Sequence, residues 1–393
     1  MKTLLRFALP LVALPTLALA VYAPIPEQEQ GKPLTFRLGA SAYHDSNIFG
    51  ASTDEIDSMV YNVTGAISYN GSLTDQTFAS ASYELSNDHM VDRPGKKNLY
   101  SHTLTARLAH SFSSATNIDL SALYNVDKNP QSLRATGPLN TDQSLKRFEL
   151  DGKYTTAVGE KTGVVTKYRY IDFSYDNPSL AANLDHTENL VGLELSYALL
   201  PETKLVGEYR YQAIRYDDNS TTMKDKTSNF LMGGVDYHPG EKLLVSGRAG
   251  FEARQRDAAA DTTTPYVELS SRYTYTEGSF LAAGYTYAIE EPSDTNSYTD
   301  TDVNRIFVNV QHRLSGTFTA SGSLTYEPST LQGRSSKHAD TDEKTTRFGL
   351  GVSWLPNKNW TVAGTYDHDE VNSDDPDRGQ IRDRFGVSAR FTF

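Results

Sequence analysis

Cysteine is absent from all 393 residues of the sequence. Its absence excludes a disulfide framework, thiolate catalysis and any metal site built on cysteine ligands. A chain without cysteine is suited to an oxidising compartment outside the cytosol, although many cytosolic proteins also lack this residue. Composition therefore removes several chemistries and leaves the cellular compartment open.

Long apolar runs and excess positive charge are also missing. Beyond residue 20 the sequence has no run of about 18 apolar residues, the length that a transmembrane helix requires, so we expect no such helix. The formal net charge of −12 disfavours nucleic acid as a partner, because phosphates repel an acidic protein. Hydrophobic residues make up only 38% of the chain, which fits a soluble protein or a barrel whose strands expose alternate residues to lipid.

The N-terminal segment has the features of a secretory signal. Lys2 and Arg6 are positively charged, residues 7–17 are mostly apolar, and residues 18–20 have the A-x-A form of a cleavage site. We therefore predict that residues 1–20 form a cleavable signal peptide. The predicted mature chain then consists of a proline-containing periplasmic lead-in, residues 21–33, and a single barrel domain, residues 34–393.

The strongest pattern in the remaining sequence is an alternation with period two. At the C-terminus the apolar and polar residues fall on opposite faces of one strand: Phe385, Val387, Ala389, Phe391 and Phe393 against Arg384, Gly386, Ser388, Arg390 and Thr392. Residues 145–157 alternate in the same way, with successive charged residues on one face. Such a face would be out of place between two packed sheets and is expected beside water inside a barrel.

About 18 segments of roughly ten residues carry this alternation, the length that a tilted strand needs to cross a bilayer. Short turns and longer polar stretches alternate between them, as periplasmic turns and extracellular loops do in outer-membrane proteins. We predict an all-β fold, a single transmembrane antiparallel up-and-down β-barrel of about 18 strands (roughly 16 to 18), with both termini in the periplasm. The predicted strands are 34–44, 59–70, 77–86, 99–112, 118–127, 145–157, 163–174, 187–199, 204–215, 228–238, 243–254, 265–276, 280–289, 303–314, 317–327, 344–355, 360–367 and 383–393.

Aromatic residues gather near the ends of these strands. Tyr83 and Tyr124 fall late on strands that run outward, whereas Tyr69, Trp354 and Phe393 fall late on strands that run inward. Amphipathic rings prefer the membrane interface, so the placement predicts an aromatic girdle at each rim of the barrel.

A short motif closes the first predicted strand. The segment Tyr43 to Phe49, and in particular Tyr43, Asp45 and Asn47, resembles the opening motif of the "putative β-barrel porin 2" family. Some members of that family occur with exopolysaccharide biosynthesis and export systems. The final strand, with Phe391 and Phe393, resembles the assembly signal that the barrel-insertion machinery reads in outer-membrane proteins.

These resemblances imply a protein of the outer membrane of a Gram-negative bacterium. The implied partners are the lipid bilayer, lipopolysaccharide and the barrel-insertion machinery. If the barrel serves polysaccharide export, periplasmic polysaccharide-export proteins are further implied partners.

Catalytic and cofactor motifs are sparse. Histidines are scattered along the chain, and neither a G-x-S-x-G elbow nor a phosphate-binding glycine loop occurs, so we predict no enzymatic activity and no cofactor. His44, Ser46 and Asn47 fit a turn better than a catalytic group. The acidic stretch 367–378 does not have the spacing of an EF-hand loop, so it offers only weak candidate cation ligands, Asp369, Glu370, Asp374, Asp375 and Asp377.

Charged residues on the predicted inner face are the strongest functional candidates. They can pair across strands and keep a lumen hydrated, and rings of charge can set ion selectivity. The mixture of signs, with some excess of arginine, predicts a weak preference for anionic or hydroxylated solutes. The predicted pore-lining residues are Arg37, Arg147, Glu149, Asp151, Lys153, Lys167, Arg169, Glu208, Arg210, Arg248, Arg272, Arg305, Arg347, Arg384 and Arg390.

Three functions are compatible with such a barrel. Because barrels of about 16 to 18 strands enclose an aqueous channel, we expect a porin-like channel for small hydrophilic or saccharide solutes. The alternatives are the barrel component of exopolysaccharide secretion and a structural or adhesive barrel with a plugged lumen. Residues 128–144 are long enough to fold inward as a constriction. Inward-facing aromatics, which would favour sugar transport, are few: Tyr43, Phe78, Phe173 and Tyr266.

Overall fold

The computed structural model describes residues 33–130, 142–219, 223–257, 259–335 and 338–393. The predicted signal peptide, most of the predicted lead-in and the middle of the predicted constriction at 128–144 lie outside these residues. None of the helices in the described part of the chain has the length and apolarity needed to cross a membrane.

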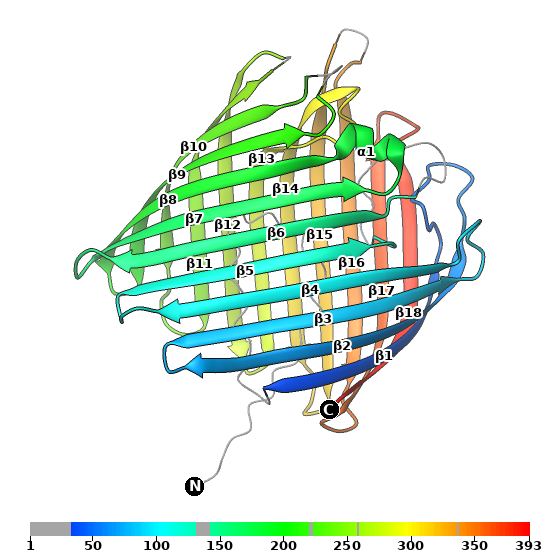
Figure 1. Ribbon diagram of the computed structural model, residues 1–393, viewed down its shortest axis with the longest axis horizontal. Coiled ribbons are helices and arrows are strands. Elements are labelled where there is room, and N and C mark those ends of the chain that lie inside the picture. Colours follow the sequence, from blue (N-terminus) through cyan, green and yellow to red (C-terminus); the bar gives the residue numbers. More distant parts are fainter. Residues whose placement is uncertain (1–32, 131–141, 220–222, 258, 336–337) are drawn as a thin grey trace.

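Eighteen antiparallel strands form one closed sheet, in which each strand pairs with its neighbours in sequence and β18 pairs back onto β1 (Figure 1). The predicted strand number, order and closure are therefore confirmed. The strands are β1 (Leu34–Asp45), β2 (Ser58–Thr74), β3 (Thr77–Met90), β4 (Asn98–Ser111), β5 (Thr116–Asp127), β6 (Leu145–Ala157), β7 (Thr162–Tyr175), β8 (His186–Leu200), β9 (Thr203–Tyr216), β10 (Lys226–Tyr237), β11 (Leu243–Arg256), β12 (Thr262–Thr276), β13 (Ser279–Glu290), β14 (Tyr298–Arg313), β15 (Phe318–Gly333), β16 (Thr341–Trp354), β17 (Trp360–Ser373) and β18 (Gln380–Thr392).

Several strands extend further than predicted, most of them at the end that carries the long loops, although β2 continues to Thr74 at a short turn. β3 continues to Met90, β15 to Gly333 and β17 to Ser373, and β14 begins at Tyr298. The extensions are polar on both faces, so the alternation that marks a lipid-facing strand ends before the ladder of hydrogen bonds does. Sequence pattern thus identified the apolar band of the wall and missed its polar rim.

One helix, α1 (Pro178–Leu184), lies in a connection that was predicted to be irregular. Asn177 caps it by accepting a hydrogen bond from the Ser179 backbone N–H, and Pro178 occupies the first turn, where no N–H is needed. Leu180 and Leu184 bury one face of the helix against Tyr175 at the end of β7. The helix lies over the long-loop end of the barrel (Figure 1).

The two faces of the sheet differ as the alternation requires. On β18 the outward Val387 is 64% exposed, whereas the inward Arg382 is only 2% exposed. Outward tyrosines such as Tyr83, Tyr124 and Tyr209 are exposed as well, as expected of rings on a lipid-facing surface. The apolar face therefore points away from the lumen, and most charged strand residues point into it.

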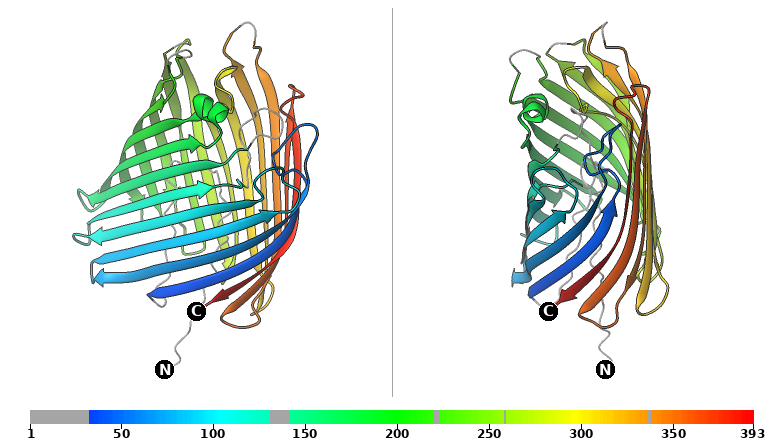
Figure 2. Two further views of the ribbon diagram at one scale, coloured as in Figure 1. Left: turned by 45° about the vertical axis from the view of Figure 1, so that its right-hand side comes forward. Right: turned by 90° about the vertical axis from the view of Figure 1, so that its right-hand side faces the viewer.

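The barrel is flattened, because it is broad in one view and narrow in the view at a right angle to Figure 1 (Figure 2). β10 and β11 approach each other closely on the inner face. A Cβ at Gly250 would lie 1.9 Å from the Leu231 carbonyl oxygen, and one at Gly234 would lie 2.1 Å from the Gly247 carbonyl oxygen. Only glycine fits at these two positions, because the neighbouring backbone leaves no space for a Cβ.

Candidate functional site in the barrel lumen

Long charged side chains fill the inner face of β7 to β12. Glu208 on β9 lies at the centre of the first group, where its carboxylate accepts hydrogen bonds from Lys167 Nζ at 2.9 Å and Arg210 Nε at 2.8 Å. Arg248 on β11 reaches the same carboxylate at 3.8 Å and forms a hydrogen-bonded ion pair with Asp236 at 2.8 Å. Lys167, Glu208 and Arg210 are buried, so these charges neutralise one another rather than facing water.

A second charged group lies nearer the long-loop end, on β10 to β14. Arg254 Nη1 donates to Asp300 Oδ1 at 2.6 Å, and its Nε donates to Glu252 at 2.8 Å. Lys226 Nζ donates to Glu291 at 2.8 Å and lies 3.2 Å from Asp300. Because β11 and β14 are three strands apart, the Arg254–Asp300 pair bridges the lumen at the closely curved side of the barrel. We call both groups together the charged wall.

Small uncharged residues line the opposite inner face. One continuous cross-strand row consists of Thr319, Ser353, Ala363, Ser388, Ser41 and Asn62, on β15 to β18, β1 and β2. The next row towards the long loops consists of Ser321, Gly351, Thr365 and Gly386. We call these two rows the small-residue wall. Hydroxyls, an amide and glycines there offer hydrogen-bonding groups with little side-chain volume.

Charges beside the small-residue wall are only partly compensated. Arg37 on β1 lies 3.8 Å from Glu84 on β3. Arg390 on β18 is paired in register with Gly39, so it is the diagonal neighbour of Arg37 on the same face. Two guanidinium groups therefore accompany one carboxylate, and the side chains of Arg37 and Glu84 are 27% and 46% exposed. This point can attract an anion or a hydroxyl-rich solute.

The motif at the end of β1 anchors the first long loop, residues 46–57, inside the barrel mouth. Asp45 is fully buried and binds Arg382, whose Nε donates at 2.9 Å and whose Nη1 also donates to the Pro130 carbonyl oxygen at 3.1 Å. Asn47 is also buried and exchanges hydrogen bonds with Ala51, at 2.8 and 2.9 Å. The motif residues thus have a structural role in this chain, holding a loop against the seam between β1 and β18.

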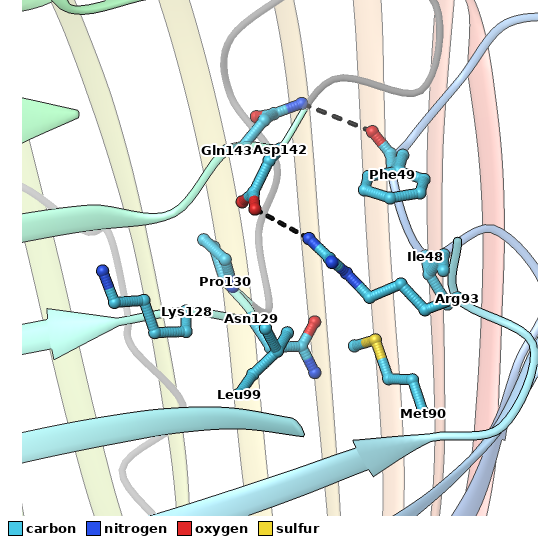
Figure 3. A pocket seen from close by; sticks show the side chains of 10 residues that line it. All are labelled: Ile48, Phe49, Met90, Arg93, Leu99, Lys128, Asn129, Pro130, Asp142 and Gln143. Atoms are coloured by element: carbon cyan, nitrogen blue, oxygen red, sulfur yellow. Dashed lines mark hydrogen bonds and ion pairs between the residues drawn. The ribbon is translucent and has the colours of Figure 1, made fainter. Parts of the chain in front are cut away.

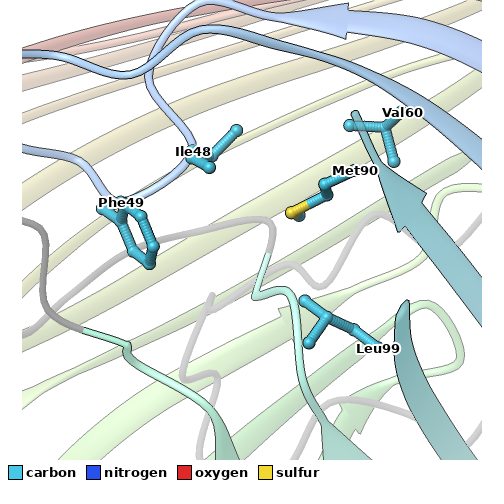
Figure 4. Packing of buried hydrophobic residues seen from close by; sticks show 5 residues of the cluster. All are labelled: Ile48, Phe49, Val60, Met90 and Leu99. Atoms are coloured by element: carbon cyan, nitrogen blue, oxygen red, sulfur yellow. The ribbon is translucent and has the colours of Figure 1, made fainter. Parts of the chain in front are cut away.

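Apolar residues of the same loop pack into the lumen. Ile48 and Phe49 join Val60, Met90 and Leu99 in a buried cluster (Figure 4). Apolar packing on the inner face closes part of the long-loop end, because these side chains leave little room for water between the loop and the wall of β2 to β4.

A small pocket beside this cluster is bridged by polar contacts (Figure 3). Arg93 donates to Asp142 at 2.7 Å and its guanidinium lies 5.2 Å from the centre of the Phe49 ring. Burial alone would raise the pKa of Asp142, but hydrogen bonds from Ser144 and the charge of Arg93 outweigh it and hold the pKa below its usual value. Gln143 adds a hydrogen bond to the Phe49 carbonyl oxygen. Arg93 belongs to the second long loop, so these contacts join the first, second and third long loops.

The predicted pore-lining residues all occupy inward positions of their strands, but their environments differ. Lys167, Glu208, Arg210, Arg248 and Arg305 are buried among partners, Lys153 and Arg272 are exposed, and the others are partly exposed. Remaining contacts are Arg147 with Glu149, Arg169 with Asp151, Arg305 with Glu290 and Glu327, Arg384 and Arg347 with Asp369, and Arg272 over the Phe280 ring.

Important members of the charged wall escaped sequence reasoning. Lys226 and Asp300 lie in strand extensions that were predicted as loops, and Arg254 is the last residue of a predicted strand. Their signal was present, because each continues the inward register of its own strand. Among the predicted inward aromatics, Tyr266 packs on Phe230, and Phe173 stacks on His186, which stacks in turn on Tyr216.

The weak candidates for cation binding are dispersed. β17 extends to Ser373, so Asp369 and Glu370 belong to a strand and not to the predicted acidic loop. Asp369 points inward to Arg384, whereas the adjacent Glu370 lies on the other face near His368. Within the described residues no group of three or more acidic or histidine side chains is placed to hold a metal ion.

His44, Ser46 and Asn47 likewise do not converge. His44 Nε2 lies 3.3 Å from Asp57, the Ser46 hydroxyl accepts from the Asp383 backbone N–H at 2.8 Å, and Asn47 binds Ala51. Each residue of the group has its own structural partner, as the turn interpretation predicts.

The terminal phenylalanine closes the barrel. Phe393 and Phe36 exchange two backbone hydrogen bonds of 3.0 Å, and their rings stack with centroids 5.4 Å apart. Phe391 packs on both Phe393 and Trp360, at 5.6 and 5.1 Å between ring centroids. The residues of the predicted assembly signal therefore form the apolar end of the β1–β18 seam at the short-turn rim.

Comparison with known proteins found similar solved structures and one family model. OpdK of Pseudomonas aeruginosa, crystallised with vanillate, is similar at 11% identity and a TM-score of 0.49, over 92% of this chain and 99% of that one. OccAB3 of Acinetobacter baumannii is similar at 10% identity and a TM-score of 0.47, over 92% of this chain and 99% of that one. No protein of curated function matches the sequence. A family model described as "Putative beta-barrel porin 2" matches residues 41–393, and the chain therefore belongs to that family, as its Tyr43–Phe49 segment predicts.

Proposed function

We propose that this protein is an outer-membrane channel of the porin type, which passes small hydrophilic solutes, including saccharides. Membership of a porin family supports the general class and the outer membrane as its location. The proposal assigns the chain no catalytic role. It also takes residues 1–20 as a signal peptide that directs the chain through the periplasm to the barrel-insertion machinery.

The observation that carries the proposal is the inner surface of the closed sheet. Eighteen strands make a ring wide enough for an aqueous channel. Ser321 and Thr365 point inward from β15 and β17 and are nevertheless exposed to solvent. Polar groups that face inward and contact water are what a solute channel requires.

The lipid bilayer and lipopolysaccharide are the proposed surroundings of the outward face. Large outward side chains such as Val387, Phe385 and Leu231 are exposed, and an apolar surface of this extent needs a lipid or detergent environment. Orientation follows from loop length, with the short turns and the β1–β18 terminus in the periplasm.

A plugged, non-conducting barrel is the competing function, because the mouth is partly closed. The first long loop packs Ile48 and Phe49 into the lumen and is tied to β18 through Asp45. If this contact blocks the whole cross-section, the protein has a structural or adhesive role instead of a transport role.

Conductance measurements separate the two functions. Protein refolded in detergent and added to a planar bilayer should produce discrete single-channel steps, and a linear malto-oligosaccharide should reduce the current. Heat-unfolded protein in the same detergent is the control. Absence of steps from protein whose folding is shown by its heat-sensitive migration on gels would overturn the channel proposal and support a plugged barrel.

Liposome swelling tests passage of uncharged sugars directly. Vesicles that contain the folded protein should swell in isotonic monosaccharide, and more slowly in a larger oligosaccharide, because a channel admits solutes by size. A barrel that serves polysaccharide export works with periplasmic partners, and these are missing from the vesicles. Polysaccharide export would therefore predict little swelling with any sugar in the outer solution.

A further inference from the structure

The two walls of the lumen differ in how much space their side chains take. Arg210 on β9 reaches the Tyr266 hydroxyl on β12 at 3.2 Å, and Arg254 reaches β14. Side chains that extend this far fill the part of the lumen beside the charged wall. Across the ring, serine, threonine and glycine project little beyond the backbone, so their side chains take less of the lumen than those of the charged wall.

The buried charged pairs also cover small residues that lie between them. On the charged wall Ser228 is 2% exposed and hydrogen-bonded to Glu252, which is 1% exposed. On the small-residue wall Ser321 and Thr365 are exposed and Ser41 and Ser388 are half-buried. Serine has the same volume at each of these positions, so Ser228 differs because the charged pairs around it keep it from the lumen. Nearer the short turns the two walls differ less, because Ser270 on β12 is exposed and Thr319 on β15 is buried.

The charges of the two sides differ in availability. Those of the charged wall are committed to each other in buried hydrogen-bonded pairs, and breaking one pair to serve a passing ion would leave its partner unpaired. The small-residue wall offers hydroxyl donors and acceptors, with the Arg37, Glu84 and Arg390 group at its border towards the short turns. Arg384, Asp367 and Asp369 lie at its border towards the long loops, where Arg384 pairs with Asp369. Such a surface exchanges hydrogen bonds with a polyhydroxylated molecule without stripping an ion of its water.

We infer that solutes cross this barrel along the small-residue wall and that this wall makes the channel selective for uncharged, hydroxyl-rich molecules. The inference rests on the proposed channel function and deepens it, by assigning both the route and the solute class. Arg37 and Arg390 together exceed the charge of Glu84 by one positive charge beside the route. A sugar acid, which carries a carboxylate, would be retained there.

The cysteine-free sequence makes the route testable by single-cysteine labelling. Ser388→Cys and Ser321→Cys place a thiol on the small-residue wall, and Ser228→Cys places one on the charged wall. Each variant is reconstituted in a planar bilayer and treated with a membrane-impermeant, glucose-sized methanethiosulfonate reagent. We expect Ser388→Cys and Ser321→Cys to lose conductance by about twofold or more, and Ser228→Cys to keep it.

Ser246→Cys guards against misfolding of the buried variant. Ser246 is half-buried on β11 and hydrogen-bonds to Asp236, so it tests the charged wall at a more accessible position. Block through Ser228→Cys or Ser246→Cys equal to that through Ser388→Cys would overturn the assigned route while leaving the channel function intact. A wild-type protein without conductance would instead defeat the proposed function itself.

Solute selectivity is measured on the wild-type channel. In liposome swelling, an uncharged hexose should enter faster than a hexose-sized divalent anion or a diamine. Arg390→Gln should shorten the time for which a sugar acid blocks single-channel current. Faster entry of either charged solute than of the hexose would overturn the assigned solute class.

Discussion

The Arg382 guanidinium lies against the Asp45 carboxylate, with Nε 2.9 Å from Oδ1 and 3.1 Å from Oδ2. Both side chains are almost completely buried at the point where the last strand meets the first. Arg382 also donates to the Pro130 carbonyl oxygen, so a single cation fixes the seam, the first long loop and the start of the third. Positions near opposite ends of the sequence therefore share one electrostatic anchor.

Asp45→Asn should release this anchor. The substitution leaves Arg382 buried without its counter-charge, and removing one partner of such a pair costs about 3–5 kcal/mol. We expect a lower unfolding temperature in detergent and a larger, noisier conductance, because loop 46–57 no longer stays packed in the mouth. Circular dichroism melting and single-channel recording measure the two effects.

Asp57→Asn is the matched control for that variant. Asp57 belongs to the same loop and contacts His44, but its side chain is 74% exposed. Exposed pairs contribute little to stability, so melting and conductance should stay at the wild-type values. Equal effects of the two substitutions would show that loop charge, and not the buried pair, controls the mouth.

Glu208→Gln should change the ion selectivity of the lumen. The Glu208 carboxylate balances Lys167 and Arg210 directly and Arg248 at longer range. Loss of its charge leaves excess positive charge on the charged wall, so the reversal potential in a salt gradient should shift towards anions. Glu241→Gln, in the exposed turn between β10 and β11, should leave the reversal potential unchanged, and a shift of equal size there would contradict this explanation.

Much of this fold could be predicted from sequence because successive side chains of a β-strand point to opposite faces of the sheet. Each lipid-facing position needs an apolar residue, so strand number, order and the asymmetry of the loops followed from alternation alone. Phe391 and Phe393 were found through the same pattern, and the segment Tyr43 to Phe49 was found as a motif.

The alternation of inward and outward positions gives no information on which inward residues meet across the ring. Arg254 and Asp300 are 46 positions apart, and their contact depends on how the sheet curves between β11 and β14. The division into a charged wall and a small-residue wall likewise appears only when the strands are arranged in order around the ring. α1 was missed because Asn177 and Pro178 also fit an ordinary loop.

The contact between the second and third long loops should depend on acid pH. Ser144 and Arg93 hold the pKa of Asp142 below its usual value, so ionised Asp142 stabilises the folded mouth. The contribution is present above the unfolded pKa of about 3.9 and is lost as the pH falls through the lower folded pKa. Conductance should therefore be constant from neutral pH down to about pH 5 and rise only below about pH 4.

Asp142→Asn should remove that acid response. The variant cannot gain a proton at this position, so its conductance at neutral pH should already resemble that of the acidified wild type. A rise in wild-type conductance between pH 6 and 5, or an unchanged acid response in the variant, would assign the transition to another group.

Deletion of Phe393 tests whether the terminal residue is read during assembly or only stabilises the product. Its backbone pairs with Phe36 and its ring stacks there, so some loss of stability is expected in either case. Refolding from urea into detergent measures the structural part without other proteins. The heat-sensitive folded fraction in outer membranes of an expressing cell measures assembly.

If the machinery reads Phe393, the deletion should reduce the folded fraction in cells by about tenfold while refolding yields stay within about twofold of wild type. Phe318→Ser is the control, because Phe318 lies on the outward face near the same rim and stacks on Trp354 without belonging to the last strand. It should affect refolding and cellular assembly equally. Equal losses in both assays for the Phe393 deletion would assign this residue to closure of the seam alone, since a defect in recognition cannot appear where no machinery is present.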